Sequence, residues 1–454
     1  MFDKSEYLKI QRRLIKNRCD FSFIPYLNIP NYHPIHLAGF NSSGISIFIN
    51  FLKNVTKFMI FLCLLNLWFL RGFTKSKKID VSNLKRKNIW FLIDQNSDSE
   101  IANFISTVST LKFIPIKIDF KLQSLVCDEN QLSVPFKKSF SYSYLLSYLK
   151  RSVEVFLALW SLKSQAYCCS FLLSEVFTVQ SLKLFLIKCA IKDLLLQLEP
   201  EVVGTTIEGN CIEDLIFRAC IELDSANIRF VGYQHTVLFP DYIGVLRLQH
   251  TVKFNELWCT GITTAEIMTR FIDADKIKVV GDFRPTFQSL LPKPKKTNIY
   301  FIIDGETQVA EKMLSILLKL SNMNGEVDFT YRLHPRCSIS KKINRLLKQL
   351  SDQENVYWDK NVQPNLNLSQ YAVFHNSILI FEALNCKLYP VYLNINEFSS
   401  NPLEIGNFSY LSYEYDRFPN FPFIDLEIVD GKLEKNRQES LCYFSKAPVT
   451  TMEE

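Results

Sequence analysis

Short, uninterrupted apolar runs separated by helical patterns constrain the fold of this chain most strongly. In residues 89–94 and 298–303 nearly every side chain is apolar, without the alternation expected of a strand with one face in water. Such runs are typical of parallel strands that are buried on both faces. Segments such as 179–198 and 211–223 have the length and pattern of helices. This alternation predicts an α/β fold with doubly wound parallel sheets.

The pattern continues along most of the chain. Predicted strands are residues 89–94, 113–118, 200–205, 228–233, 256–259, 278–280, 298–303, 328–333, 355–358, 371–374 and 388–393. Predicted helices cover about 100–111, 144–162, 179–198 and 211–223, then a segment after Thr263, one ending near Asn322, 340–350, and one from Ser377. From residue 400 onward the pattern fades.

At 454 residues the chain is too long for one ordinary domain. We expect an N-terminal extension (1–87), a Rossmann-like domain (88–255), a second Rossmann-like domain (256–425) and a tail (426–454). The two domains are expected to face a cleft. Residues 1–20 are polar and basic, so no signal peptide is expected there.

Charge and cysteine content exclude several classes of protein. The net charge of +6 fits an anionic ligand or an anionic membrane surface and is too weak to indicate nucleic acid. The 12 cysteines form no CxxC pair, which favours reduced thiols in the cytoplasm over a disulfide framework or a zinc site. The sequence contains no Walker A loop, GxGxxG, HExxH or GxSxG motif. We therefore expect no essential metal and no cofactor.

The segment 45–78 is partly hydrophobic and partly basic. Residues 58–70 contain one polar side chain, Asn66, and Arg71, Lys75, Lys77 and Lys78 follow. A helix of that length spans roughly 20 Å, which is short of the ~30 Å core of a bilayer. The segment is therefore interpreted as a buried packing helix or as an interfacial helix that meets anionic lipid, with a spanning helix as the weaker alternative.

Polar groups follow two strands of the second half. Residues 330–335 end in Arg332 and His334, with Arg336 just beyond, and residues 371–384 pass from a strand into His375, Asn376 and Ser377 before a helix. The carboxyl ends of parallel strands bind ligands, and a helix N-terminus favours a phosphate. We therefore predict an anion site there, for a nucleotide-linked donor. The alternatives are local hydrogen bonds for His334, helix capping for Asn376 or Ser377, and solvated charges for the arginines.

In the first half, Glu208 follows a strand and precedes Gly209, and Glu213 lies in the first turn of the next helix. Glu208 or Glu213 could act as a general base or stabilise a positively charged centre. For Glu213 the alternative is a favourable interaction with the helix dipole. His235 ends the neighbouring strand and is a candidate contact for donor or acceptor.

Two groups of motifs resemble known families. The segment 206–213 (Thr-Ile-Glu-Gly-Asn-Cys-Ile-Glu) and the strand end 232–236 (Gly-Tyr-Gln-His-Thr) resemble the YEG–x–x–WE and GYQH segments of bacterial surface carbohydrate biosynthesis proteins. In this chain Ile207 and Ile212 replace the Tyr and the Trp. His334-Pro335 and His375-Asn376-Ser377 resemble the HP motif and the Ser-rich segment of bacterial sialyltransferases and capsule Kdo transferases.

The resemblance implies a metal-independent GT-B glycosyltransferase that binds a nucleotide-sugar with its second half and the acceptor with its first half. A CMP-linked acidic sugar is the implied donor, and Glu382 would hold the ribose hydroxyls. The acidic motif of the sialyltransferases is missing from the first half, and Asp304-Gly305 lies in the second half, so Asp304 is not assigned its role.

The implied acceptor is a lipid-linked or growing surface polysaccharide such as lipopolysaccharide or capsule. The implied location is the cytoplasm, with peripheral contact to the inner membrane. Two alternatives stay open. One is a UDP- or GDP-sugar transferase or epimerase on the same fold, and the other is a non-catalytic component of a polysaccharide assembly complex.

Overall fold

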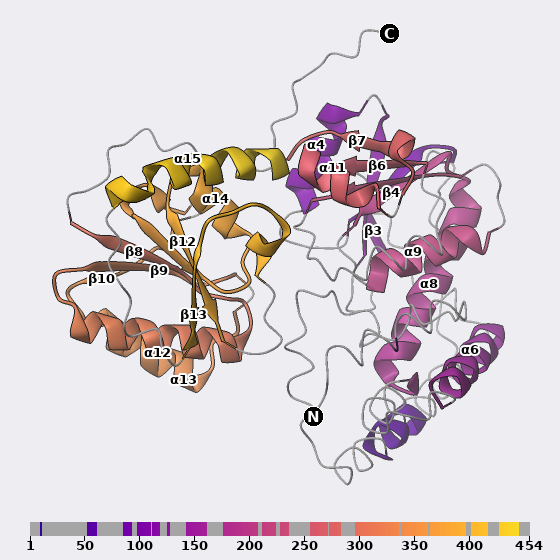
Figure 1. The fold of residues 1–454 in the computed structure, drawn as a ribbon. Coiled ribbons are helices and arrows are strands. Elements are labelled where there is room, and N and C mark those ends of the chain that lie inside the picture. Colours follow the sequence, from indigo (N-terminus) through magenta and orange to yellow (C-terminus); the bar gives the residue numbers. More distant parts are fainter. Residues whose placement is uncertain are drawn as a thin grey trace.

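A computed structural model shows two α/β halves, each built on its own sheet (Figure 1). The first half in sequence lies on the right of Figure 1 and the second on the left. The structure describes residues 10, 52–60, 85–92, 98–109, 111–118, 125–127, 142–160, 176–207, 211–223, 228–235, 255–270, 272–282, 296–335, 337–361, 364–395, 401–415 and 426–444. Together the halves are two Rossmann-like domains, consistent with the GT-B fold, so the predicted fold class is confirmed.

Sheet A forms the first half, with the strand order β3-β2-β1-β4-β5-β6-β7 in the described residues. Its strands are β1 (Asn88–Leu92), β2 (Phe113–Ile118), β3 (Leu125–Cys127), β4 (Val202–Thr206), β5 (Arg229–Gln234), β6 (Glu256–Cys259) and β7 (Ile277–Val279). Neighbouring strands are parallel except β2 and β3. The accompanying helices are α4 (Asp98–Val108), α6 (Tyr142–Trp160), α8 (Val179–Leu198), α9 (Cys211–Ile221) and α11 (Ile262–Met268).

Sheet B forms the second half and is parallel throughout its described strands, with the order β10-β9-β8-β11-β12-β13. Its strands are β8 (Asn298–Ile302), β9 (Asp328–Arg332), β10 (Val356–Trp358), β11 (Tyr371–Phe374), β12 (Tyr389–Asn394) and β13 (Leu411–Glu414). Helices α12 (Thr307–Met323) and α13 (Lys341–Ser351) cover one face. Helices α14 (Leu379–Asn385) and α15 (Leu426–Tyr443) cover the other.

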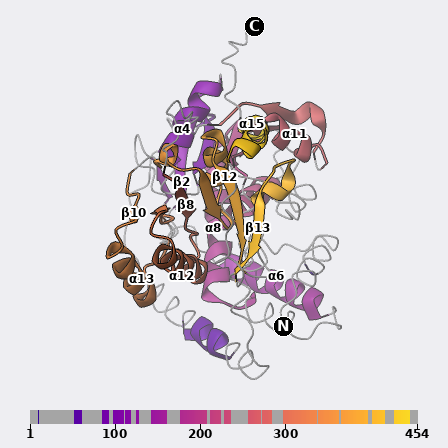
Figure 2. The ribbon, with the colours of Figure 1, turned by 60° about the vertical axis from the view of Figure 1, so that its left-hand side comes forward.

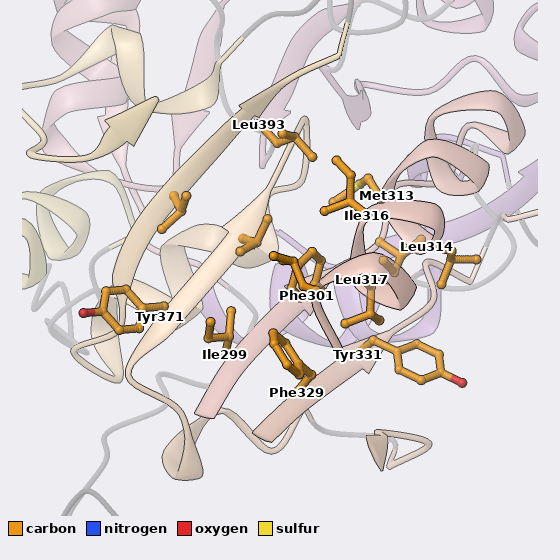
Figure 3. Packing of buried hydrophobic residues seen from close by; sticks show 14 of the residues in the cluster. Ile299, Phe301, Met313, Leu314, Ile316, Leu317, Phe329, Tyr331, Tyr371 and Leu393 are labelled. Carbon is orange, nitrogen blue, oxygen red and sulfur yellow. The ribbon is translucent and has the colours of Figure 1, made fainter. Parts of the chain in front are cut away.

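Strand β8 shows why its sequence is apolar without alternation. Ile299 and Phe301 enter the core beneath α12, where Figure 3 shows Phe301 in one cluster with Phe329 and Leu317. Tyr300 and Ile302 enter the opposite core, beneath α14. Successive side chains of a strand point to opposite faces, so a strand with two covered faces must be apolar throughout.

Helix α15 joins the two halves. It packs on α14, where the ring of Tyr443 lies 5.6 Å from that of Phe381 and the hydroxyl of Ser440 donates to the Phe381 carbonyl oxygen (3.1 Å). Its last turn reaches the first half, where the hydroxyl of Thr260 donates to the carbonyl oxygen of Tyr443 (2.9 Å). Both ribbon views place α15 beside α11 (Figures 1 and 2).

The strand pairing bears on two expected domain boundaries. The strand at 256–259 was expected to open the second domain, but β6 pairs with β5, and β7 pairs with β6. The division between the sheets therefore falls between β7 and β8. Residues 426–443, predicted as part of a tail, form α15, because Leu433 and Tyr443 are buried against the second half.

The hydrophobic N-terminal segment is described in part. Residues 52–60 are helical, whereas most of 58–70 and all of 71–84 lie outside the described residues. Phe58 is buried, and its ring centroid lies 5.9 Å from that of Tyr148 in α6. Among the helices that the structure describes, none combines the length and apolarity needed to cross a bilayer.

The contact between α15 and the first half predicts an effect of Gly261→Ala. A Cβ at Gly261 would lie 2.2 Å from the carbonyl oxygen of Cys442 and 2.4 Å from that of Tyr443. Forcing backbone atoms apart in a packed site costs about 1–3 kcal/mol. We expect the thermal unfolding midpoint to fall by several degrees, measured by circular dichroism or calorimetry.

Gly431→Ala in α15 is the matched control. Gly431 has no neighbouring atom within 4 Å of the position of a Cβ. Alanine in a helix interior is about 0.5–1 kcal/mol more favourable than glycine, so this variant should be slightly more stable than the wild type. Equal stability of the two variants would contradict the proposed tight contact at Gly261.

Candidate functional site

Three polar residues meet at the carboxyl edge of sheet B. Two of them, His334 and His375, were predicted site residues, and the third is Asp304. In the strand order β10-β9-β8-β11-β12-β13 the connections run outward on both sides from β8 and β11, which makes this pair the topological switch point. His334 follows β9, Asp304 follows β8 and His375 follows β11. Because adjacent strands lie about 4.8 Å apart, Asp304 sits between the two histidines at this edge.

The backbone at Gly305 lies directly against the ring of His334. A Cβ at Gly305 would be only 2.8 Å from Nδ1 of His334. The carboxylate of Asp304 is buried and accepts from the N–H of Glu306 (2.9 Å), which shapes the turn into α12. Helix α12 begins at Thr307, and its N-cap residue Glu306 makes no side-chain capping hydrogen bond. The half-buried imidazole of His334 thus lies beside the start of a 17-residue helix.

His375 is fully buried beside Asp304. Its Nδ1 lies 2.8 Å from the carbonyl oxygen of Leu393, so Nδ1 carries the hydrogen and donates. Its ring stacks on Tyr392, with centroids 6.1 Å apart. Burial lowers the pKa of His375 below its ordinary value, although the charge of Asp304 acts in the opposite direction. His375 is therefore uncharged at neutral pH, and its hydrogen bond to Leu393 fixes the orientation of its ring. Its contact with a donor stays a prediction.

Residues 376–382 form the remainder of the predicted donor segment. Helix α14 begins at Leu379, two residues later than the predicted start at Ser377. The hydroxyl oxygen of Ser377 accepts from the N–H of Leu379 (3.3 Å), whereas the N-cap residue of α14 is Ile378, which makes no side-chain capping bond. Asn376 and Glu382 are half-buried. Donor contacts of Asn376, Ser377 and Glu382 stay predictions.

Arg332 forms a hydrogen bond with the loop that follows β10. Its Nη1 donates to the carbonyl oxygen of Asn361 (2.6 Å) and lies 4.0 Å from Asp359. Burial alone would raise the pKa of Asp359, but hydrogen bonds from Tyr300, Asn365 and Asn361 and the charge of Arg332 lower it. Arg332 therefore already has a structural partner, and a donor contact for it stays a prediction. Arg336 lies outside the described residues.

A polar hollow lies at a different position on sheet B. It measures about 420 Å³, and its lining includes Asn298, Thr330, Tyr357, Asn361 and Asn365. Asn298 is the first residue of β8, so it stands six residues, about 20 Å of strand, before Asp304. Asp304, His334 and His375 do not line the hollow, whereas Asn361 both lines it and accepts from Arg332.

In the first half, two predicted catalytic residues belong to elements on opposite faces of sheet A. His235 is buried and stacks on Tyr233 (centroids 5.8 Å apart), whose ring contacts Phe104 of α4. Glu213 is buried in the first turn of α9, which packs on the opposite face of sheet A through Phe217 and Phe230. Glu213 and His235 thus belong to opposite faces. Glu208 lies outside the described residues.

Gln234 is a polar side chain of β5 on the face of sheet A that α9 covers. Its amide is fully buried between Ile207 and Cys259, and neither its nitrogen nor its oxygen has a hydrogen-bond partner in the described structure. A buried amide without a partner costs about 1–3 kcal/mol.

Sequence reasoning missed the contribution of Asp304 and Cys337. The N–H of Cys337 donates to the carbonyl oxygen of His334 (2.9 Å) and closes the turn after β9. Burial and the charges of Asp304 and Glu306 raise the pKa of the Cys337 thiol. Gly305 was the sequence feature that could have indicated this site, since a glycine after a buried strand indicates a close approach of another group. Within the described residues, no group of three His, Cys, Asp or Glu side chains could hold a metal ion.

Comparisons with known proteins give similarity at the level of structure alone. No protein-family model and no curated protein sequence matches the chain. Solved structures do resemble it. MnaA of S. aureus, determined with UDP, is 8% identical with a TM-score of 0.47, over 80% of this chain and 93% of that one. The UDP-GlcNAc 2-epimerase of Neisseria meningitidis bound to UDP-GlcNAc is 12% identical with a TM-score of 0.46, over 79% and 95%.

A third similar structure is the glycotransferase of kitacinnamycin, at 9% identity and a TM-score of 0.43, over 78% of this chain and 95% of that one. With TM-scores below 0.5, none of these similarities decides what this chain binds or catalyses.

The burial of His375 predicts a change of stability with pH. In the unfolded chain this histidine takes up a proton below about pH 6.5, whereas the folded chain resists protonation. The unfolded state therefore binds more protons, and the free energy of unfolding should fall as the pH drops below about 6.5. In His375→Asn, which retains a donor for Leu393, that part of the loss should disappear. Thermal unfolding midpoints between pH 5 and 8, roughly the range in which histidine titrates, measure it.

Thr330→Ala on β9 is the control, because it removes a half-buried polar group without removing a titratable one. It should keep the slope of the wild type. A His375→Asn slope equal to that of the wild type would contradict the assignment.

Proposed function

We propose that the chain is a metal-independent GT-B glycosyltransferase that binds a nucleotide-sugar at the carboxyl edge of sheet B. The observation that carries this proposal is the close approach of Gly305 to His334 at the start of α12. A glycine that leaves room for an imidazole beside the N-terminus of a long helix is the arrangement expected of a phosphate site. The switch point of the sheet lies at the same place.

The chemistry of such a site is mainly positioning and electrostatic stabilisation. His334 would donate to a phosphate oxygen, and the first N–H groups of α12 would stabilise the charge that develops as the nucleotide leaves. Ser377 and Asn376 would contact the donor from the neighbouring strand end, and Glu382 would hold the ribose hydroxyls. Arg332 would take part by exchanging its bond to Asn361 for the donor, and Arg336 would also contact the donor.

The first half is proposed to bind the acceptor. Glu208 is the candidate base for the acceptor hydroxyl, with Glu213 or His235 as alternatives. Because Glu213 and His235 belong to opposite faces of sheet A, they are not proposed to act as a pair.

The donor is proposed to be a CMP-linked acidic sugar, on the strength of His334-Pro335 and His375-Asn376-Ser377. The acceptor is proposed to be a lipid-linked or growing surface polysaccharide at the cytoplasmic face of the inner membrane. A UDP- or GDP-sugar transferase or epimerase on the same fold is the second candidate. The non-catalytic alternative rests on the replacement of Tyr and Trp by Ile207 and Ile212.

A nucleotide-binding experiment tests the donor site. The free full-length chain is heated with CMP, CDP, UMP, UDP or GDP, and the unfolding midpoint is recorded. A ligand at 100 times its Kd adds about 2.7 kcal/mol of stability, which is readily measured. His334→Ala should weaken binding of the active nucleotide by about ten- to a hundredfold, because it removes a hydrogen bond to a charged group.

Gly305→Ala provides a second, independent variant. Its Cβ would displace the ring of His334 without removing it, so nucleotide affinity should fall as well. Thr330→Ala on the same strand should bind nucleotide normally. A midpoint shift with UDP or GDP alone would discard the CMP donor, and incubation with UDP-GlcNAc followed by NMR would then separate transfer from epimerisation. No shift with any nucleotide would remove the proposed donor site.

A further inference from the structure

Two helices at the far end of the first half lie side by side. Phe58, from the helix at residues 52–60, packs on Tyr148 of α6, and Tyr148 packs in turn on Phe185 of α8, with centroids 5.6 Å apart. Both helices therefore use their inner faces to join the first half, at the lower end of Figure 1.

The outer faces of the same two helices carry several large apolar side chains. Six large apolar side chains are exposed there, with exposed fractions from 47% for Val153 to 67% for Leu146; they are Leu52, Met59, Ile60, Leu146, Val153 and Leu157. In α6 the exposed residues 146, 153 and 157 follow helical spacing, opposite the buried Tyr148 and Val155. A contiguous exposed apolar patch marks an interaction surface.

Lysines are interleaved with these apolar side chains. Lys53 and Lys57 are exposed on the first helix, and Lys150 is exposed on the apolar stripe of α6. Glu154 is the single acidic residue in residues 52–60 and 142–160. Apolar side chains mixed with lysines on a helix surface are typical of a helix that lies at the interface of an anionic bilayer.

The charges decide between two occupants of this surface. A second copy of the chain in a two-fold dimer would bring two surfaces with the same excess of lysine together, and like charges across an interface are unfavourable. An anionic lipid surface offers the opposite charge to the lysines and a hydrocarbon boundary to the apolar side chains. The sequence that follows residue 60 is apolar to residue 70 and then basic, which continues the same character along the chain.

We propose that residues 52–60 and α6 form a docking surface for an anionic phospholipid bilayer. Leu52, Met59, Ile60, Leu146, Val153 and Leu157 enter the boundary between headgroups and acyl chains, and the three lysines contact the headgroups. The inference deepens the proposed function. Membrane binding itself does not depend on that function, but its role does, since a transferase held at the membrane would meet a lipid-linked acceptor there.

Vesicle co-sedimentation of the full-length chain, without nucleotide, tests the inference. The probes are vesicles of phosphatidylcholine alone and of an equimolar mixture with phosphatidylglycerol. The wild type should partition onto the anionic vesicles on the order of 100-fold better than onto the neutral ones, given three lysines near the surface. Raising the salt concentration should reduce that difference.

Two variants divide the surface into its parts. Leu146→Gln/Leu157→Gln should lower partitioning onto both kinds of vesicle, and Lys53→Gln/Lys57→Gln should lower it onto anionic vesicles only. The matched control is Met323→Gln/Ile339→Gln, which alters two similarly exposed apolar residues in the second half and should bind like the wild type. Circular dichroism confirms that each variant is folded.

Three outcomes would overturn the proposal. They are no sedimentation of the wild type with anionic vesicles, sedimentation unchanged in both surface variants, or a dimer in light scattering that dissociates in Leu146→Gln/Leu157→Gln while vesicles are not bound. Vesicle binding and nucleotide binding are measured separately. A chain that binds vesicles but no nucleotide would keep the docking surface and lose the donor site.

Discussion

Burial of both faces of each sheet is the constraint on which the structure depends. In β4, β8 and β11 almost every residue is buried, so polar side chains find room mainly where a strand ends. Helices must then cover both faces, which forces the chain to alternate strand and helix. The same constraint collects Asp304, His334 and His375 at one edge, because their strands are neighbours in sheet B. Packing and candidate chemistry thus have one cause.

Local sequence was sufficient to predict what depends on local pattern. The strands near 89–92 and 298–302 and the helix at 179–198 were found because their apolar character is continuous or periodic. The sheet to which β6 belongs could not be predicted, since the apolar pattern of its four residues fits a position beside β5 as well as one beside β8. Helix α15 was missed because its sequence is polar, and a few buried residues such as Leu433 and Tyr443 hold it in place.

The candidate site shows the same division between local and distant causes. His334 was predicted from its place at a strand end, and the structure puts it there. Its apposition to Gly305 depends on strand order, which no local pattern contains. The bond from Arg332 to Asn361 likewise joins residues 29 positions apart. Residue types at strand ends were therefore predictable, and their partners were not.

The placement of α15 has a consequence for the synthesis of the chain. The core beneath α14 includes Tyr443 and Phe444. The last turn of α15 also contacts Thr260 and Gly261 in the first half. Neither half can complete its packing until residues near 444 have left the ribosome. A product truncated before residue 426 would expose Phe381 and its neighbours, and chaperones and proteases recognise such apolar surface. The presence of α15 thus determines whether a newly made chain exposes this apolar surface.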